Sequence, residues 1–419
     1  MEKNEIISKA NHCLCCPKKS CQSGCPLQND TMEAIKLVKE EKYKQAYELL
    51  CDTTVLQSIC GRICPHEKQC QGKCIRGIKT EPVQIGSIEA FLGDLAIENN
   101  WKIPKKAEIK KEKIAVIGSG PSSLTCAAFL ARKGYNVTIL EKYNKLGGLL
   151  NYGIPEFRLS KEILNKSIEK ILELGITVKL NTELEKDYTL ESLLREYDAV
   201  YLGIGANIST KMNIDGEELE GVYGGNELLE NNSHPDYTDK SVAVIGGGNV
   251  AMDTARTIKK MGAKEVTVIY RRAEEQMPAE KKEIEDAKKE GIKFLFQNNI
   301  LKIFGTDKVE KIECIKTELK KKEEEDRLSP VNIEGSNYIL DMDYIVMAVG
   351  SRPEEKLLEK LNVKLNKWNR IEIDENNMTS IEGVFAGGDI AGAKSTVAWA
   401  AKSGRDAAYS IIKYLNGKC

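Results

Sequence analysis

Cysteine residues crowd the first part of this chain at spacings that suit metal binding. Of the thirteen cysteines in the 419-residue sequence, ten lie between Cys13 and Cys74. Eight of these form two groups, Cys13-x2-Cys16-x4-Cys21-x3-Cys25 and Cys60-x3-Cys64-x5-Cys70-x3-Cys74. Neither spacing matches a bacterial ferredoxin run or a pair of zinc-ribbon knuckles. Thiolates stabilise iron–sulfide cores through their softness and charge, so the two groups predict iron–sulfur clusters, with a zinc-binding head as the alternative.

Composition and charge limit the classes of protein in which this cysteine cluster can occur. The 62 Lys and Arg residues nearly balance the 63 Asp and Glu residues, which gives no electrostatic case for nucleic-acid binding. No apolar run reaches the roughly 18 residues that a membrane-spanning helix needs. The N-terminal stretch MEKNEIISKANHC lacks the apolar core of a signal peptide. We therefore expect a cytoplasmic protein, where clustered cysteines are more often a metal site than a disulfide network.

A first glycine-rich turn lies within residues 113–142, KIAVIGSGPSSLTCAAFLARKGYNVTILEK. An apolar strand, a turn, a helix of small residues and a second strand make one βαβ unit. Gly118 and Gly120 fill two positions of the dinucleotide fingerprint, and Ser123 departs mildly from the Gly or Ala of the third. The second strand ends at Glu141, a carboxylate suited to a ribose 2′-OH. The unit therefore predicts an adenosine with a free 2′-OH.

The same pattern returns in residues 241–272, SVAVIGGGNVAMDTARTIKKMGAKEVTVIYRR. Here the second strand ends in arginines instead of an acid. Arginines bind a 2′-phosphate through charge-assisted, bidentate hydrogen bonds, so this unit predicts NADP(H), with plain surface charges as the alternative for the arginines. The predicted coenzyme residues are Gly246, Gly248, Asn249, Ala251, Arg271 and Arg272.

Two further segments, EKYNKLGGLLNYGIPEFRL and AGGDIAGAKSTVAWAAKSGRDAA, resemble the two-dinucleotide flavoproteins of the pyridine nucleotide–disulfide oxidoreductase family. The resemblance implies that the first unit binds FAD and that Thr396 and Val397 open a helix directed at the flavin ring. The chain departs from the disulfide reductases because no cysteine follows Gly148 and the second unit has only Cys314. Electrons must therefore leave the flavin another way. The implied FAD residues are Gly118, Gly120, Ser123, Glu141, Gly148, Gly388, Asp389, Thr396 and Val397.

The cysteine-rich head, together with GIPEFRL and RRAEEQMPA, resembles a domain shared by glutamate synthase beta subunits, the large subunit of NADH-dependent ferredoxin:NADP oxidoreductase and dihydropyrimidine dehydrogenase. The resemblance implies two [4Fe–4S] clusters. One would be held by Cys13, Cys16, Cys21 and Cys74, and the other by Cys25, Cys64, Cys70 and Glu89. A helix-surface glutamate is the alternative for Glu89. Cys15, Cys51 and Cys60 have no ligand role in this scheme.

These interpretations combine into an α/β protein with two Rossmann-like domains and an N-terminal α-helical iron–sulfur domain. The expected boundaries are 1–109 for the head, 110–238 and 345–419 for the FAD domain, and 239–344 for the NADP(H) domain. Electrons would pass from NADPH through FAD and the clusters to a partner such as the glutamate synthase large subunit, and no side chain is assigned a catalytic role. The alternatives are a ferredoxin- or NADH-linked transhydrogenase-type subunit, an electron input for another oxidoreductase, or a regulatory module that only senses nucleotides.

Overall fold

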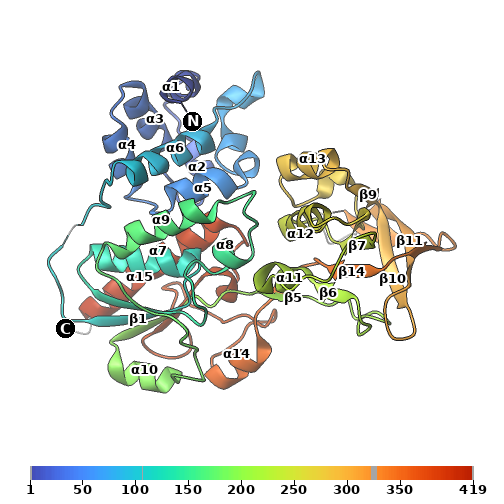
Figure 1. Cartoon of the computed structure of the whole chain (residues 1–419). Helices are drawn as coiled ribbons and strands as arrows, with labels where there is room; N and C mark the ends of the chain where they lie inside the picture. The colour runs from blue at the N-terminus through green and yellow to red at the C-terminus, as the bar shows by residue number, and fades with distance from the viewer. Residues whose placement is uncertain (1, 106, 322–327, 418–419) are drawn as a thin grey trace. The chain divides into compact units, whose positions relative to one another are not determined.

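The computed structural model describes residues 2–105, 107–321 and 328–417, and the chain forms two compact units (Figure 1). The first unit comprises Met1–Asn151, Glu156–Ala206 and Pro353–Cys419. The second comprises Tyr152–Pro155 and Asn207–Arg352. The three domain boundaries expected from the sequence stay a prediction. Within the described residues no helix is both long enough and apolar enough to span a membrane.

The N-terminal head of the first unit is helical. Its apolar positions recur at helical spacing, so that Ile35 and Val38 of one helix and Leu50 of the next lie in a shared core. Two later helices cross closely, because a Cβ at Gly61 would lie 2.3 Å from the Ala90 nitrogen. The helices are α1 (Lys3–Asn11), α2 (Ser20–Gly24), α3 (Thr31–Lys39), α4 (Tyr43–Leu50), α5 (Gln57–Ile63) and α6 (Ile85–Glu98), with the short helices η1 (His66–Lys68), η2 (Gln71–Lys73) and η3 (Ile75–Ile78).

A five-stranded parallel sheet forms the rest of the first unit, in the order β16-β4-β1-β2-β3. Its strands are β1 (Lys113–Ile117), β2 (Asn136–Leu140), β3 (Thr177–Lys179), β4 (Ala199–Leu202) and β16 (Val384–Ala386). The C-terminal strand β16 pairs with β4, so the end of the chain returns to the first sheet. The helices are α7 (Pro121–Arg132), α8 (Leu149–Tyr152), α9 (Lys161–Leu172), α10 (Leu190–Glu196), α14 (Glu355–Leu361), η5 (Gly388–Ala391) and α15 (Val397–Gly417).

The second unit contains another five-stranded parallel sheet, in the order β6-β14-β7-β8-β9. Its strands are β6 (Val222–Gly224), β7 (Ser241–Ile245), β8 (Glu265–Tyr270), β9 (Lys293–Phe296) and β14 (Tyr344–Met347). The helices are α11 (Gly225–Asn231), α12 (Asn249–Lys260), η4 (Glu274–Gln276) and α13 (Lys281–Lys289). The smaller strands are β10 (Asn298–Phe304), β11 (Lys311–Lys320), β12 (Ser329–Asn332), β13 (Tyr338–Asp341) and the pair β5 (Ile208–Ser209) and β15 (Ser351–Arg352). The predicted fold class, two Rossmann-like parts with a helical head, is confirmed.

Candidate functional site

The first glycine-rich turn joins β1 to α7 in a conformation that favours glycine. Gly118 has φ +83°, and a Cβ there would lie 2.8 Å from the Gly203 carbonyl oxygen. Nothing lies within 4 Å of a Cβ at Gly120, which leaves the start of α7 open to a ligand. Ser123, the departure from the fingerprint, lies buried with its hydroxyl 3.3 Å from the carbonyl oxygens of Ile117 and Gly203. The serine therefore satisfies its own polar group at the tight helix–strand contact.

Glu141 follows β2 and is oriented toward this turn. The Ser119 hydroxyl donates to one Glu141 oxygen at 2.5 Å, and the Tyr143 backbone N–H donates to the other at 2.9 Å. Burial raises the pKa of Glu141, and the hydrogen bond from Ser119 opposes that shift. The carboxylate thus stands at the edge of the turn, where a ribose 2′-OH is expected.

Two of the other predicted FAD residues, Gly148 and Gly388, approach the same helix start. A Cβ at Gly148 would lie 3.0 Å from the Gly120 Cα, and one at Gly388 would lie 3.0 Å from the Ser122 side chain. Gly404 of α15 permits the close crossing of α7, since a Cβ there would lie 1.9 Å from the Ser122 oxygen. Segments separated by more than two hundred residues therefore meet at the first turn of α7.

Asp389 lies within η5, and burial raises the pKa of its carboxyl from 3.8 to about 6, with Arg370 opposing the shift. The Arg370 guanidinium also donates to the Asp389 backbone oxygen at 3.0 Å. A partly buried carboxyl at this place fits the FAD-contacting role that the resemblance implies for Asp389.

Ionisation of Asp389 should make the flavin-free protein less stable as the pH rises. The folded protein holds this proton up to a pH of about 6, whereas the unfolded chain releases it near 3.8, so this contribution to stability is present below pH 3.8 and is lost as the pH rises to about 6. Asp389→Asn should abolish that slope in unfolding experiments on flavin-free protein. Asp374→Asn, at an exposed turn, is the control and should leave the slope in place. An unchanged slope in Asp389→Asn would contradict the assignment.

The second glycine-rich turn joins β7 to α12 in the second unit. Gly246 has φ +142°, and a Cβ there would lie 2.2 Å from the Ala348 carbonyl oxygen. The ring of Tyr270 would lie 2.6 Å from a Cβ at Gly247, so the turn packs against the end of β8. Ala251, in the third position of the fingerprint, is fully buried in α12. The turn meets the requirement for close backbone approach to a pyrophosphate.

Arg271 and Arg272 follow β8 directly, at the carboxyl edge of the sheet where parallel-sheet ligands bind. Their backbone is held in place, because the Thr317 hydroxyl donates to the Arg271 oxygen at 2.9 Å and the Gln297 N–H donates to the Arg272 oxygen at 3.0 Å. Arg271 is exposed and Arg272 is half-buried. The Arg272 Nε is buried and has no hydrogen-bond partner within the described residues. The site therefore retains an unused donor where a 2′-phosphate is expected.

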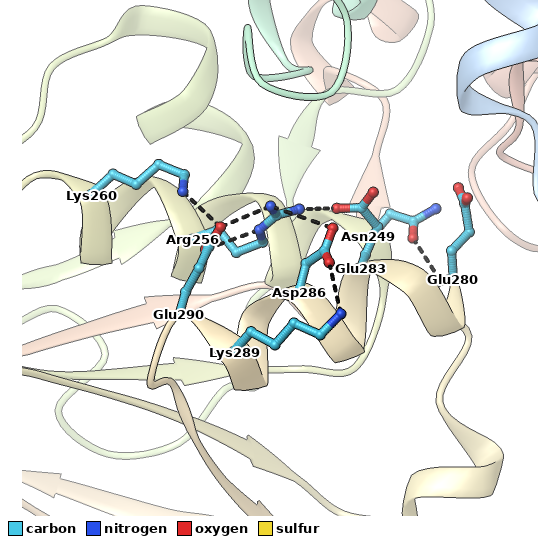
Figure 2. Close-up of polar contacts among 8 residues, drawn as sticks. All are labelled: Asn249, Arg256, Lys260, Glu280, Glu283, Asp286, Lys289 and Glu290. Atoms are coloured by element: carbon cyan, nitrogen blue, oxygen red, sulfur yellow. Dashed lines mark hydrogen bonds and ion pairs between the residues drawn. The ribbon is translucent and has the colours of Figure 1, made fainter.

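A buried ion-pair network supports α12 from α13 (Figure 2). The Asn249 side chain, at the start of α12, accepts a hydrogen bond of 3.1 Å from the Glu280 N–H, which precedes α13. Arg256 donates to both oxygens of Glu290 at 3.0 and 2.9 Å and to Glu283, which is itself buried. Lys260 adds a bond of 2.7 Å to Glu290. The helix that carries the second glycine turn is thereby fixed at both ends to its neighbour.

Arg256→Met should destabilise the second unit by about 3–5 kcal/mol, because it leaves Glu283 buried without its counter-charge. Lys260→Met removes an exposed partner of the same Glu290 and should cost no more than about 1 kcal/mol. Hydrogen exchange of the β7 and β8 amides measures this difference within the unit. Equal losses of stability in Arg256→Met and Lys260→Met would show that burial of the ion-pair network does not contribute to the stability of the second unit.

The first predicted cluster group lies around one cavity of the head. Cys13, Cys16, Cys21 and Cys74 all line it, although they come from segments up to sixty residues apart. All four side chains are partly exposed. Burial raises the pKa of Cys21, and the neighbouring Cys13 and Cys74 raise it further. The structure therefore brings together the four thiols that the resemblance assigned to one cluster.

The second predicted group is more deeply placed. Glu89 of α6 is buried and accepts a hydrogen bond of 3.2 Å from Asn29, so the alternative of a helix-surface glutamate is wrong. Burial raises the pKa of Glu89 to about 8. Burial and the nearby Glu89 charge raise the pKa of Cys25 to about 12, and the same causes raise that of Cys70. Cys64, the fourth member, also lies near Glu89.

The donor chemistry of both groups fits iron–sulfur clusters, since each offers three or four thiols in a partly or fully buried setting. Within the part of the chain that the structure describes, no group of three or more His, Cys, Asp or Glu side chains is arranged so that it could hold a metal ion. Cys60, which the ligand scheme leaves out, lies beside Cys64 and forms a hydrogen bond with it. The spacing in the sequence already groups Cys60 with Cys64, whereas the ligand scheme implied by the resemblance gives Cys60 no role.

The head packs directly on the part of the first unit that is predicted to hold FAD. The Gln69 side chain, adjacent to Cys70, lies 3.5 Å from the Thr396 hydroxyl, adjacent to the start of α15. Arg405 of α15 donates to the Leu27 backbone oxygen at 2.7 Å. These contacts join residues more than three hundred positions apart, so no local sequence pattern predicts them. They place the second cysteine group next to the helix predicted to face the flavin.

Comparison with known proteins agrees with this architecture. Residues 112–406 match the family model described as pyridine nucleotide-disulphide oxidoreductase, and residues 1–101 match the model described as dihydropyrimidine dehydrogenase domain II, 4Fe-4S cluster. The small chain of glutamate synthase [NADPH] from Escherichia coli strain K12 is 36% identical over 97% of this chain and 91% of that protein.

Two further similarities bear on the fold and on the partner. The beta subunit of NADP(+)-dependent formate dehydrogenase from Moorella thermoacetica is 34% identical over 94% of this chain and 60% of that protein. The structure of Mycobacterium tuberculosis FprA in complex with NADPH matches with a TM-score of 0.66 and 21% identity, covering 74% of this chain and 85% of that one. The chain therefore belongs to the pyridine nucleotide-disulphide oxidoreductases and, over nearly its whole length, to the family of glutamate synthase small chains.

Proposed function

We propose that this chain is the NADPH-oxidising, electron-transferring subunit of a larger oxidoreductase, and that its partner is a glutamate synthase large subunit. The observation that carries the proposal is the contact between Gln69 and Thr396, which joins the cysteine-rich head to the predicted flavin helix. The named relative from Escherichia coli is the small chain of a glutamate synthase that uses NADPH, which supports the same partner class.

In this proposal, bound FAD would supply hydride acceptance from NADPH and single-electron release to two [4Fe–4S] clusters. The chain's own residues bind and orient these groups. Arg271 and Arg272 hold the 2′-phosphate, and the turns at Gly118 and Gly246 receive the two pyrophosphates. The N-terminal N–H groups of α15, from Val397 onward, direct positive potential toward the flavin ring and favour negative charge on it.

The proposed cluster ligands are Cys13, Cys16, Cys21 and Cys74 for the cluster in the cavity, and Cys25, Cys64, Cys70 and Glu89 for the buried one. The buried group lies next to the flavin segment through Gln69, whereas the other is partly exposed. The order of electron flow follows from these positions. With both clusters bound, the residues around Cys64 would receive electrons first, and the cavity with Cys21 would pass them on to a partner in the cytoplasm.

A second candidate partner is supported by the formate dehydrogenase beta subunit of Moorella thermoacetica, to which the chain is nearly as similar. In that case the same parts connect NADP(H) to a different oxidoreductase. The two candidates differ only in the partner chain, so co-purification of the native complex distinguishes them.

The test is iron, sulfide and flavin analysis of anaerobically purified protein, followed by NADPH addition in a visible spectrometer. We expect about eight irons and one FAD per chain. We also expect the flavin absorbance to bleach with NADPH. Zinc in place of iron, or a flavin that NADPH cannot bleach, would refute the proposal and favour a nucleotide-sensing module.

A further inference from the structure

The mouth of the cavity that holds Cys13, Cys16, Cys21 and Cys74 has an unusual surface composition. Its fifteen lining residues include four basic side chains, Lys18, Lys19, Lys73 and Arg76, and no acidic one. Asp30 neutralises Lys19 at 2.7 Å. Lys18 and Lys73 are exposed, and Lys79 follows them at the end of η3. The rim therefore carries a local positive charge in a chain whose net charge is only −1.

Exposed apolar side chains lie among these basic residues. Leu14 is 54% exposed and Ile75 is 40% exposed, and both line the cavity mouth. Ile78, in the same short helix as Ile75, is 77% exposed. An apolar centre with a charged rim is the usual composition of a transient protein interface. We call Leu14, Lys18, Lys73, Ile75, Arg76, Ile78 and Lys79 the collar.

Acidic residues near the collar do not cancel its charge at the cavity. Glu67 and Glu81 are exposed on the same stretch of chain but do not line the mouth. In the second group Cys64, Cys70 and Glu89 are buried and only Cys25 is partly exposed, whereas all four thiols of the first group are partly exposed. Electron transfer between proteins requires short distances between redox centres. The partly exposed first group is therefore the one that an external acceptor can approach closely.

We propose that the collar is the docking surface for an electron-accepting protein that presents an acidic face with an apolar centre. This inference rests on the proposed function and identifies where electrons leave the chain. One NADPH gives NADP+, a proton and two electrons, which reduce two molecules of a one-electron acceptor. Complementary charge steers the encounter and sets orientation, so it affects association more than the transfer step itself.

The test uses the complete protein with its cofactors and two haem acceptors of opposite charge. NADPH-driven reduction is measured with the acidic soluble domain of cytochrome b5, with basic cytochrome c and with a small tetrazolium dye. At low salt the double variant Lys18→Glu/Lys73→Glu should raise the KM for cytochrome b5 about tenfold. It should lower the KM for cytochrome c, while dye reduction and iron content stay unchanged.

The control is Lys356→Glu/Lys360→Glu, which makes the same charge change on exposed residues of α14 and should alter neither KM. In the unmodified protein, added salt should raise the KM for cytochrome b5. Equal effects of the two double variants, or no salt effect on cytochrome b5, would overturn the docking surface. If the unmodified protein fails to reduce the dye with NADPH, the proposed function itself is wrong, which is a separate outcome.

Discussion

Replacing both Arg271 and Arg272 by alanine is expected to weaken NADPH binding about a hundredfold and to leave NADH binding nearly unchanged. A hydrogen bond to a charged group contributes about 1.5–3 kcal/mol, and two such contacts to the 2′-phosphate at the lower end of that range account for a factor of about a hundred. NADH lacks that phosphate, so its affinity does not depend on these contacts. The backbone bonds from Thr317 and Gln297 do not involve the replaced side chains, so the end of β8 should keep its position.

The measurement is the dissociation constant of each coenzyme, followed by quenching of the flavin or protein fluorescence. Lys264→Ala is the matched control, because Lys264 is exposed and precedes β8 at the opposite end of the strand. It removes a positive charge from the same unit and should affect neither coenzyme. Arg271→Lys tests geometry, since lysine keeps the charge but loses the bidentate fork. Equal weakening of both coenzymes in the double variant would assign the arginines to general stability.

The glycine turns could be predicted from the sequence because their requirements are local. Gly118 and Gly246 adopt positive φ within a few residues of the strands that they follow, and those strands have clear apolar patterns. The pattern that ended each second strand in an acid or in arginines was equally local. Such features need no knowledge of distant parts of the chain.

The contacts that join the head to the flavin segment could not be predicted in the same way. Gln69 and Thr396 are 327 positions apart, and they meet because the head packs against α15, which no pattern in the sequence predicts. The burial of Glu89 likewise depends on the crossing of α5 and α6 at Gly61 and Gly93, where a Cβ on either glycine would collide with the other helix. The resemblance supplied Glu89 as a ligand, but the helix crossing supplies the physical reason that it faces the cysteines.

Cys21→Ser is expected to remove about half of the iron while FAD stays bound at one per chain, if two [4Fe–4S] clusters are present. Cys21 lines the cavity together with Cys13 and Cys74, and no member of the proposed second group lines that cavity. Loss of one thiolate leaves that cluster with three ligands and exposes it to solvent. The second cluster keeps its own residues, so its signal in electron paramagnetic resonance should survive reduction by dithionite.

Cys15→Ser provides the matched control, because Cys15 lies between Cys13 and Cys16 but has no ligand role in the proposed scheme. Its thiol lies 3.6 Å from the Lys39 ammonium, so the replacement by a hydroxyl keeps a polar partner there. Iron content should stay at the level of the unmodified protein.

The reciprocal variant Cys64→Ser should remove the other half of the iron. Gln69 connects that group to Thr396, at the start of the helix predicted to face the flavin. Cys64→Ser should therefore also slow the reduction of a protein acceptor by NADPH. NADPH should still bleach the flavin in this variant. Unchanged iron in Cys21→Ser, or loss of all iron from it, would show that the two groups do not form separate clusters.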